Sequence, residues 1–94
     1  MYLILLQFVK PVSRLKVHIE KHKAFLDKYY KSGHFVYLGN KTPFTGTLII
    51  CKAKNRKEVE NIMMEDPLAA DHVAFYEIIE FEPAKHFDAL SKFF

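Results

Sequence analysis

The sequence predicts a single α+β domain of the ferredoxin-like type, with strands and helices in the order β-α-β-β-α-β. Four short apolar segments bounded by proline, glycine or asparagine indicate the strands, and two longer segments with apolar residues every three or four positions indicate the helices. The length of 94 residues fits one domain over residues 1–94, and a hydrophobic content of 50% fits a packed core.

The first strand and first helix occupy the N-terminal third of the chain. Residues 2–9 are apolar apart from one glutamine, and Pro11 ends the run, as expected for a strand buried on both faces. Ser13 is expected to cap the helix that follows, and Gly33 to end it. The apolar face of this helix consists of Leu15, Ile19, His22, Phe25, Leu26, Tyr29 and Tyr30.

Two further strands are expected on either side of a turn. Residues 35–38 form the second strand, and Gly39-Asn40 is expected to end it. The segment 41–46, which contains Pro43 and Gly46, is a turn or loop. Residues 47–53 form the third strand.

The second helix and fourth strand complete the predicted order. Asn55 is expected to cap the helix, with Glu58 three residues later as its capping-box partner. Asp66-Pro67 is expected to end it, followed by a short irregular stretch. Residues 73–81 form the long fourth strand. The amphipathic residues 84–94 predict a C-terminal helical tail.

The strands are apolar on both alternating sets of side chains. Two helices cover only one face of a four-stranded sheet, and a solvated second face would show regular polar alternation. In the first strand, however, the side chains of the second face are also apolar, and they include Leu3, Leu5 and Val9. The sequence therefore predicts that the same face of another copy covers this one, in a two-fold homodimer.

Charge and composition argue against several other classes of protein. The net charge is +3, from 14 basic and 11 acidic residues whose signs are interspersed, which favours solvated faces over a site for an anionic partner or nucleic acid. Cys51 lies alone in an apolar run, which predicts a buried, inert thiol and a reducing, cytoplasmic location. The apolar start is too short to span a membrane and lacks the features of a signal peptide.

His22 and Asp66 are the residues from which we expect chemistry. His22 lies in the inward stripe of the first helix, where it is either a core histidine bonded to a backbone carbonyl or a general acid/base that faces a pocket. Asp66 is either a turn residue before proline or the carboxylate that orients the histidine. Both are expected on the same side of the sheet.

Metal and cofactor sites are not predicted. His18 and His22 are four residues apart, and Asp71 and His72 are further ligand types, but the zincin glutamate pattern and a second ligand pair at fixed spacing are missing. The three glycines are dispersed and form no phosphate-binding loop. No serine has the context of a nucleophile elbow.

Several ordered motifs resemble those of the YCII-related family. The stretch from His22 to Phe35 is similar to the family pattern H-[RK]-x-F-L…Y…G-x-F, and Asp66-Pro67-Leu68 is similar to its D-P-F motif. The segment 76–83, Y-E-I-I-E-F-E-P, resembles the Y-x-I-x-E-F-x-P strand. Pro43, Gly46 and Ile49 fit its P-x-x-G-G-x-I turn loosely.

The resemblance implies a dimeric α+β barrel with one small-molecule pocket per subunit, holding the pair His22 and Asp66. It implies proton-transfer elimination or isomerisation of a small cyclic compound, because the similar subgroup includes a dehydrochlorinase that acts on a chlorinated hydroxyquinol. His22 would be the general acid/base, and Asp66 would orient it. The expected pocket residues are Phe8, Phe25, Leu38, Gly39 and Phe44.

Two departures from the family pattern fall in this pocket. Leu38-Gly39-Asn40 stands where the subgroup has S-G-P, and Pro43-Phe44 stands where it has P-R, so a hydroxyl and an arginine are missing. A more apolar ligand explains these changes, and so does a non-catalytic binding or scaffold domain that keeps the dimer and the pocket. The sequence does not decide whether dimers associate further.

Overall fold

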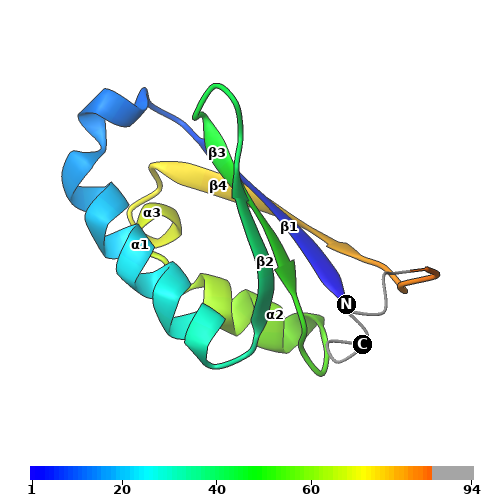
Figure 1. Ribbon diagram of the computed structural model, residues 1–94. Helices are drawn as coiled ribbons and strands as arrows, with labels where there is room; N and C mark the ends of the chain where they lie inside the picture. Colours follow the sequence, from blue (N-terminus) through cyan, green and yellow to red (C-terminus); the bar gives the residue numbers. More distant parts are fainter. Residues whose placement is uncertain (86–94) are drawn as a thin grey trace.

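The computed structural model describes residues 1–85 and confirms the α+β, ferredoxin-like class (Figure 1). The predicted C-terminal helical tail lies outside the described residues from residue 86 onward. The elements are β1 (Tyr2–Phe8), η1 (Val12–Arg14), α1 (Lys16–Lys31), β2 (Phe35–Asn40), β3 (Gly46–Cys51), α2 (Arg56–Met63), α3 (Pro67–Ala70) and β4 (Ala74–Glu80).

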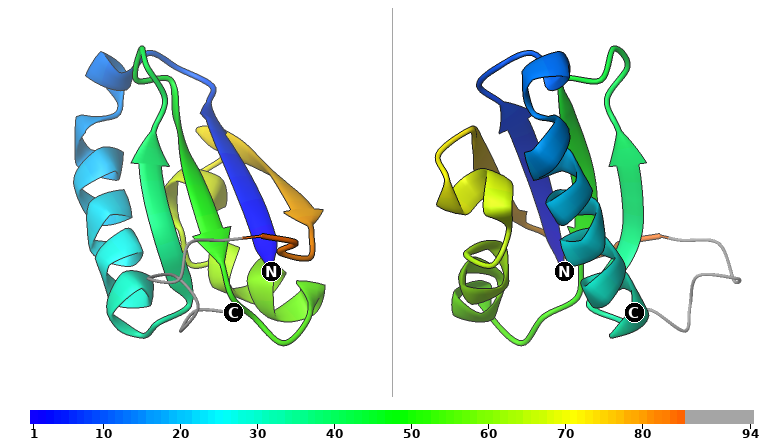
Figure 2. Two further views of the ribbon diagram at one scale, coloured as in Figure 1. Left: turned by 45° about the vertical axis from the view of Figure 1, so that its right-hand side comes forward. Right: turned by 90° about the vertical axis from the view of Figure 1, so that its left-hand side faces the viewer.

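The four strands form one antiparallel sheet in the order β2-β3-β1-β4. At the centre of β1, Leu5 pairs with Leu48 of β3 on one side and with Glu77 of β4 on the other. Figure 2 shows the strands in front of the helices in one view and behind them in the other, so the helices cover one face only. Because both edges of β1 are paired, its backbone hydrogen bonds are satisfied within the sheet, while its two faces differ in what covers them.

The core lies between the sheet and the three helices. From β1, alternate side chains point into it, and Ile4 and Leu6 are at most 1% exposed. Each such side chain stabilises the fold by about 1.5–3 kcal/mol through the apolar surface it removes from water. The helices contribute Ile19, Phe25, Tyr29, Val59, Ile62, Met63 and Leu68.

The other face of the sheet carries no helix among the described residues (Figure 2). Strand register places Leu3 beside Ile50 and Ile79, and Leu5 beside Leu48. Ile79 is 39% exposed and the others are half-buried. The apolar second face expected from the sequence is therefore present in the single subunit.

The start of α1 and the end of β2 differ from the sequence predictions. Ser13 does not cap α1, because the chain first makes the 3₁₀ turn η1 and the helix begins after Leu15. Gly39 and Asn40 do not end β2 but belong to it, and Asn40 pairs with Thr47 of β3. Gly33 ends α1 as predicted, with a left-handed φ of 88° that favours glycine.

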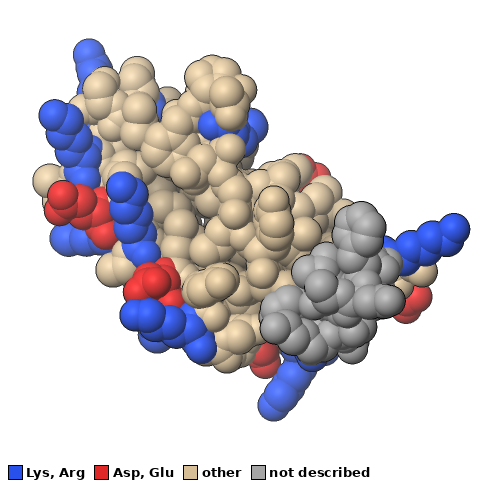
Figure 3. Space-filling view, viewed as in Figure 1, with Lys and Arg blue, Asp and Glu red and all other residues tan. Residues whose placement is uncertain are grey.

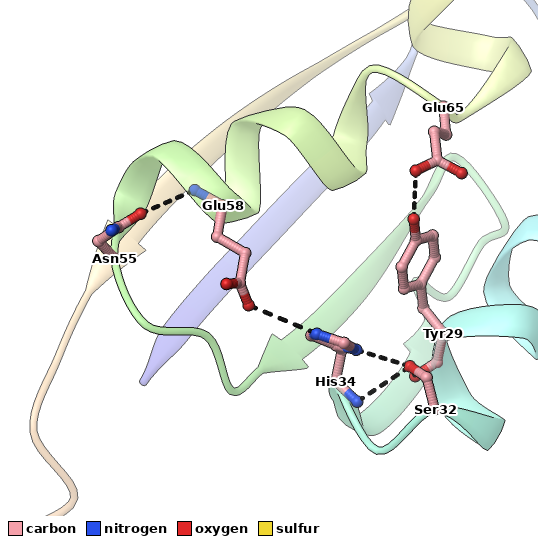
Figure 4. Close-up of polar contacts among 6 residues, drawn as sticks. All are labelled: Tyr29, Ser32, His34, Asn55, Glu58 and Glu65. Atoms are coloured by element: carbon pink, nitrogen blue, oxygen red, sulfur yellow. Dashed lines mark hydrogen bonds and ion pairs between the residues drawn. The ribbon is translucent and has the colours of Figure 1, made fainter.

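The region between α2 and β4 also differs. Asn55 caps α2 as predicted, and its Oδ1 accepts the backbone N–H of Glu58 at 2.9 Å. The Glu58 carboxylate does not close a capping box but lies 3.4 Å from Nε2 of His34 (Figure 4). The stretch after α2 is not irregular but contains α3, which Asp66 caps and Pro67 begins.

Acidic and basic side chains are mixed on the surface over α1 (Figure 3). Lys31 and Asp27, for example, form an ion pair at 2.9 Å. The surface over the neighbouring strands in this view is formed mainly by uncharged residues. None of the helices within residues 1–85 has the length and apolar character needed to cross a bilayer.

Glu65 joins the segment after α2 to the last turns of α1. Its carboxylate accepts hydrogen bonds from the Tyr29 hydroxyl (Figure 4) and from Lys28 Nζ at 2.7 Å. These bonds favour the ionised carboxylate, with the Lys28 bond as the largest cause, and they hold the pKa of Glu65 below its ordinary value of 4.5. Glu65 therefore stabilises the fold most when it is ionised.

We predict that Glu65→Gln lowers the free energy of unfolding at neutral pH and has little effect in acid. Because the folded-state pKa lies below 4.5, the stabilisation is fully present above that value and is lost as the pH falls through the folded-state pKa. Urea titrations between about pH 7 and pH 3, the range in which carboxyl groups titrate, measure the difference. Asp27→Asn is the control, since its exposed pair with Lys31 contributes little at any pH. A difference for Glu65→Gln that is constant with pH would contradict the prediction.

Candidate active site

His22 lies in the middle of the buried stripe of α1, between Ile19 and Phe25, and is 1% exposed. Its ring stacks on Phe25 with 6.3 Å between ring centroids and 25° between the planes. A neutral imidazole tolerates this apolar setting only if its N–H group has a hydrogen-bond partner.

Asp66 supplies that partner from the N-terminus of α3. It is fully buried, its backbone is extended as expected before proline, and its Oδ1 accepts the backbone N–H of Leu68 at 3.1 Å. The capping role therefore fixes the carboxylate in the helix layer. The same oxygen also faces the side chain of His22 on α1.

The two side chains contact each other directly. Nδ1 of His22 lies 3.0 Å from Oδ1 and 3.1 Å from Oδ2 of Asp66. A carboxylate that already receives the Leu68 N–H acts as an acceptor, so this arrangement assigns a proton to Nδ1 of His22. In the neutral ring, Nε2 is then the nitrogen with a free lone pair.

Three acidic residues of the segment 65–71 contact α1 at positions successively nearer its N-terminus. Glu65 accepts a hydrogen bond from Tyr29, and Asp66 contacts His22 two turns nearer the N-terminus. Asp71 lies 3.1 Å from His18, one further turn towards the N-terminus. His18 and His22 thus engage separate aspartates. Within residues 1–85, no three histidine, cysteine, aspartate or glutamate side chains are grouped so as to hold a metal ion.

A cavity of about 350 Å³ adjoins His22 between α1 and the β2–β3 hairpin. Of the expected pocket residues, Leu38, Gly39 and Phe44 are in its wall. Phe8 and Phe25 are not, because Phe8 packs edge-on against Phe44 with centroids 5.1 Å apart and Phe25 lies against the His22 ring. The complete lining is Ile19, His22, Lys23, Leu26, Leu38, Gly39, Asn40, Phe44 and Thr47.

Thr47 is a polar residue of this cavity that the sequence analysis did not single out. Its side chain is 1% exposed, and Oγ1 lies 3.5 Å from Nε2 of His22. The signal was present, because strand alternation places Thr47 on the same inward face as Ile49 and Cys51. The preceding Gly46 is required by close packing, since a Cβ there would lie 1.9 Å from the carbonyl oxygen of Leu6.

A second hollow, of about 520 Å³, lies between α3 and the outer strand β4. It is larger than the His22 cavity but does not reach the His22–Asp66 pair. Its wall is mostly apolar, and its residues are Met64, Ala69, Ala70, His72, Ala74, Phe75 and Tyr76. The convergence of polar groups therefore favours the smaller cavity as the active site.

The fold is a ferredoxin-like α+β domain with a cavity beside a buried histidine–aspartate pair. The model of the YCII-related domain family matches residues 1–82, and the chain belongs to this family. Among solved structures, the fold is similar to the 5-chloro-2-hydroxyhydroquinone dehydrochlorinase TftG from Burkholderia phenoliruptrix AC1100, in complex with 2,5-dihydroxybenzoquinone, with a TM-score of 0.65 and 18% sequence identity. The match covers 87% of this chain and 94% of that one. No curated protein matches the sequence.

We predict that Asp66→Ala lowers the free energy of unfolding by about 2–4 kcal/mol. The substitution leaves the buried N–H of His22 without its acceptor, at a cost of about 1–3 kcal/mol, and removes a helix cap worth about 1 kcal/mol. Denaturant unfolding measures the loss. Asp71→Ala is the matched control, because Asp71 is 61% exposed and its pair with His18 should contribute less than about 1 kcal/mol. Equal losses in the two variants would contradict the importance of the buried pair.

Proposed function

We propose that the protein is a small-molecule enzyme in which His22 acts as the general acid/base and Asp66 orients it. The observation that supports this most strongly is the buried bond from Nδ1 to Asp66, which leaves Nε2 beside the cavity. A histidine held in this way has one nitrogen committed to the protein and one available to a substrate.

The proposed reaction is elimination or isomerisation of a small cyclic compound. Nε2 of neutral His22 takes a proton from the substrate, and Asp66 stabilises the imidazolium that forms. In an elimination, the electrons of the broken bond form a double bond while a leaving group such as chloride departs with its own bonding pair. In an isomerisation, the imidazolium returns the proton to a different atom. A general acid/base in the correct position contributes about 10²–10⁴-fold in rate.

The size and lining of the cavity support a single-ring substrate. A volume of about 350 Å³ is at the lower end of the range for small-molecule sites, roughly 300–1,000 Å³. Leu26, Leu38 and Phe44 provide apolar walls for a ring. The complex of the dehydrochlorinase with 2,5-dihydroxybenzoquinone gives one example, at this fold, of a ligand of that size.

A non-catalytic binding or scaffold domain is the second candidate function. Leu38 and Phe44 favour it, because both lie in the cavity wall and neither supplies the hydroxyl or cation that the family pattern has at these positions. A binding domain needs the cavity and the stable pair but no proton transfer. The two functions therefore differ in whether His22 is required for turnover.

We predict that the protein releases chloride from 5-chloro-2-hydroxyhydroquinone or a related chlorinated ring, and that His22→Asn lowers the rate by about 100-fold or more. Ion chromatography of chloride measures turnover. His18→Asn is the control, since it removes the partly exposed histidine one turn earlier on α1. Full turnover by His22→Asn would exclude the proposed mechanism. Ligand binding with no chloride release and no isomerised product from any ring tested would favour the binding domain.

We also propose that two copies associate through the uncovered face of the sheet. The support is an apolar surface that includes Leu3, Leu5 and Ile50 at its centre, with Phe75 63% exposed towards its edge. The exposed Glu77, which pairs with Leu5, interrupts this surface on β4. Exposed apolar surface of this kind marks an interface, and a two-fold axis lets one face cover itself.

We predict that sedimentation velocity will find a dimer for the wild-type protein and a monomer for Ile79→Lys. The lysine would bring a charge into the apolar interface, whereas Ile79 is 39% exposed in the single subunit, so the fold should tolerate it. Val17→Lys, on the exposed side of α1, should remain a dimer. A monomeric wild-type protein would contradict the proposed dimer.

A cytoplasmic location stays a proposal, supported by the state of Cys51. The thiol is fully buried in the core, and burial raises its pKa to about 11, so it is protonated and unreactive at neutral pH. A lone structural thiol of this kind suits a reducing compartment.

A further inference from the structure

We propose that Thr47 contacts the ligand and, together with His22, holds one ionisable hydroxyl group of it, so that the site selects enols and phenols. The proposal deepens the proposed function and rests on its assignment of His22 as the acid/base. It adds a second polar contact and names the ligand group that this contact recognises.

The first step is the position of the Thr47 hydroxyl. Thr47 lies on the inward face of β3, lines the cavity and is 1% exposed. Among residues 1–85, the hydrogen-bond partner of Oγ1 is Nε2 of His22 at 3.5 Å, which is longer than the usual 2.7–3.2 Å. A buried hydroxyl with such a weak bond has hydrogen-bonding capacity to spare, and so has Nε2.

The second step is the direction of the hydrogen bonds. Because Nδ1 carries the proton that Asp66 accepts, Nε2 of neutral His22 is an acceptor. The Thr47 hydroxyl can donate. An oxygen seated at both groups would therefore accept from Thr47 and donate its own proton to Nε2. A hydroxyl meets both requirements, whereas an ether or a carbonyl oxygen only accepts.

The third step is the charge that follows proton transfer. When the ligand O–H gives its proton to Nε2, the ligand becomes an oxyanion and His22 an imidazolium. The oxyanion keeps the hydrogen bond from Thr47, and the ionisable side chains of the cavity wall, His22 and Lys23, are both basic. The buried Asp66 carboxylate lies on the far side of the imidazole ring, at Nδ1. The cavity thus favours a hydroxyl acidic enough to ionise, as in a phenol or an enol.

The test uses 4-nitrophenol and its methyl ether, 4-nitroanisole, as matched probes. The two have the same ring, but only the phenol can donate a proton, and its anion has a distinct visible absorption. We expect the wild-type protein to bind the phenol more tightly than the ether and to increase the fraction present as the anion. Thr47→Val should weaken binding of the phenol by about fivefold and lower that anion fraction, with a smaller loss for the ether, whose oxygen remains neutral.

Thr47→Ser keeps the hydroxyl and should restore both properties, which a purely structural role for Thr47 would not predict. Equal binding of the phenol by Thr47→Val and wild type, equal binding of phenol and ether by wild type, or no binding of the phenol at millimolar concentration would overturn the proposal. These results leave the His22 turnover test unaffected. Conversely, selective phenol binding without any turnover would contradict the proposed enzyme and leave the hydroxyl site in place.

Discussion

The hydrogen bond between His22 and Asp66 is the interaction on which the rest of the site depends. It joins α1 to the cap of α3, and it pairs two polar side chains that are 1% and 0% exposed. Each satisfies the other in the buried layer between α1 and α3, so neither can be replaced by an apolar residue without leaving a buried polar group unpaired. The same bond fixes which nitrogen of His22 is left for the cavity. Stability and chemistry are therefore linked at this contact.

Much of the fold could be predicted from the sequence, because long periodic segments carry a strong signal. The four strands, both long helices and the cap at Asn55 follow from alternation, helical spacing and turn residues. The four-residue helix α3 could not be predicted in the same way, since it is too short for a periodic pattern and Asp66-Pro67 is equally typical of a helix end. The predicted cap at Ser13 was wrong because this residue lies within the 3₁₀ turn that precedes α1.

Less of the site could be predicted from the residues alone. His22 and Asp66 are 44 positions apart. The residues alone place both on one side of the sheet and leave their pairing as one of two alternatives, and the family resemblance favours the pair. Strand alternation places Thr47 on the inward face of β3, but the cavity that this face meets is a tertiary feature that no local pattern encodes. Phe8 and Phe25 were expected in the pocket, but an apolar side chain suits a pocket and a core equally well. In the structure they pack behind the cavity lining, Phe8 against Phe44 and Phe25 against His22.

Nitrogen NMR of His22 in the selectively labelled protein is the most direct test of this account. We predict that in the neutral ring the proton resides on Nδ1, with chemical shifts that identify Nε2 as unprotonated. In Asp66→Ala this preference for Nδ1 should be lost. A proton on Nε2 in the wild-type protein, or an equal mixture of the two tautomers, would contradict the assignment of Asp66 as the orienting group and of Nε2 as the nitrogen that serves the cavity.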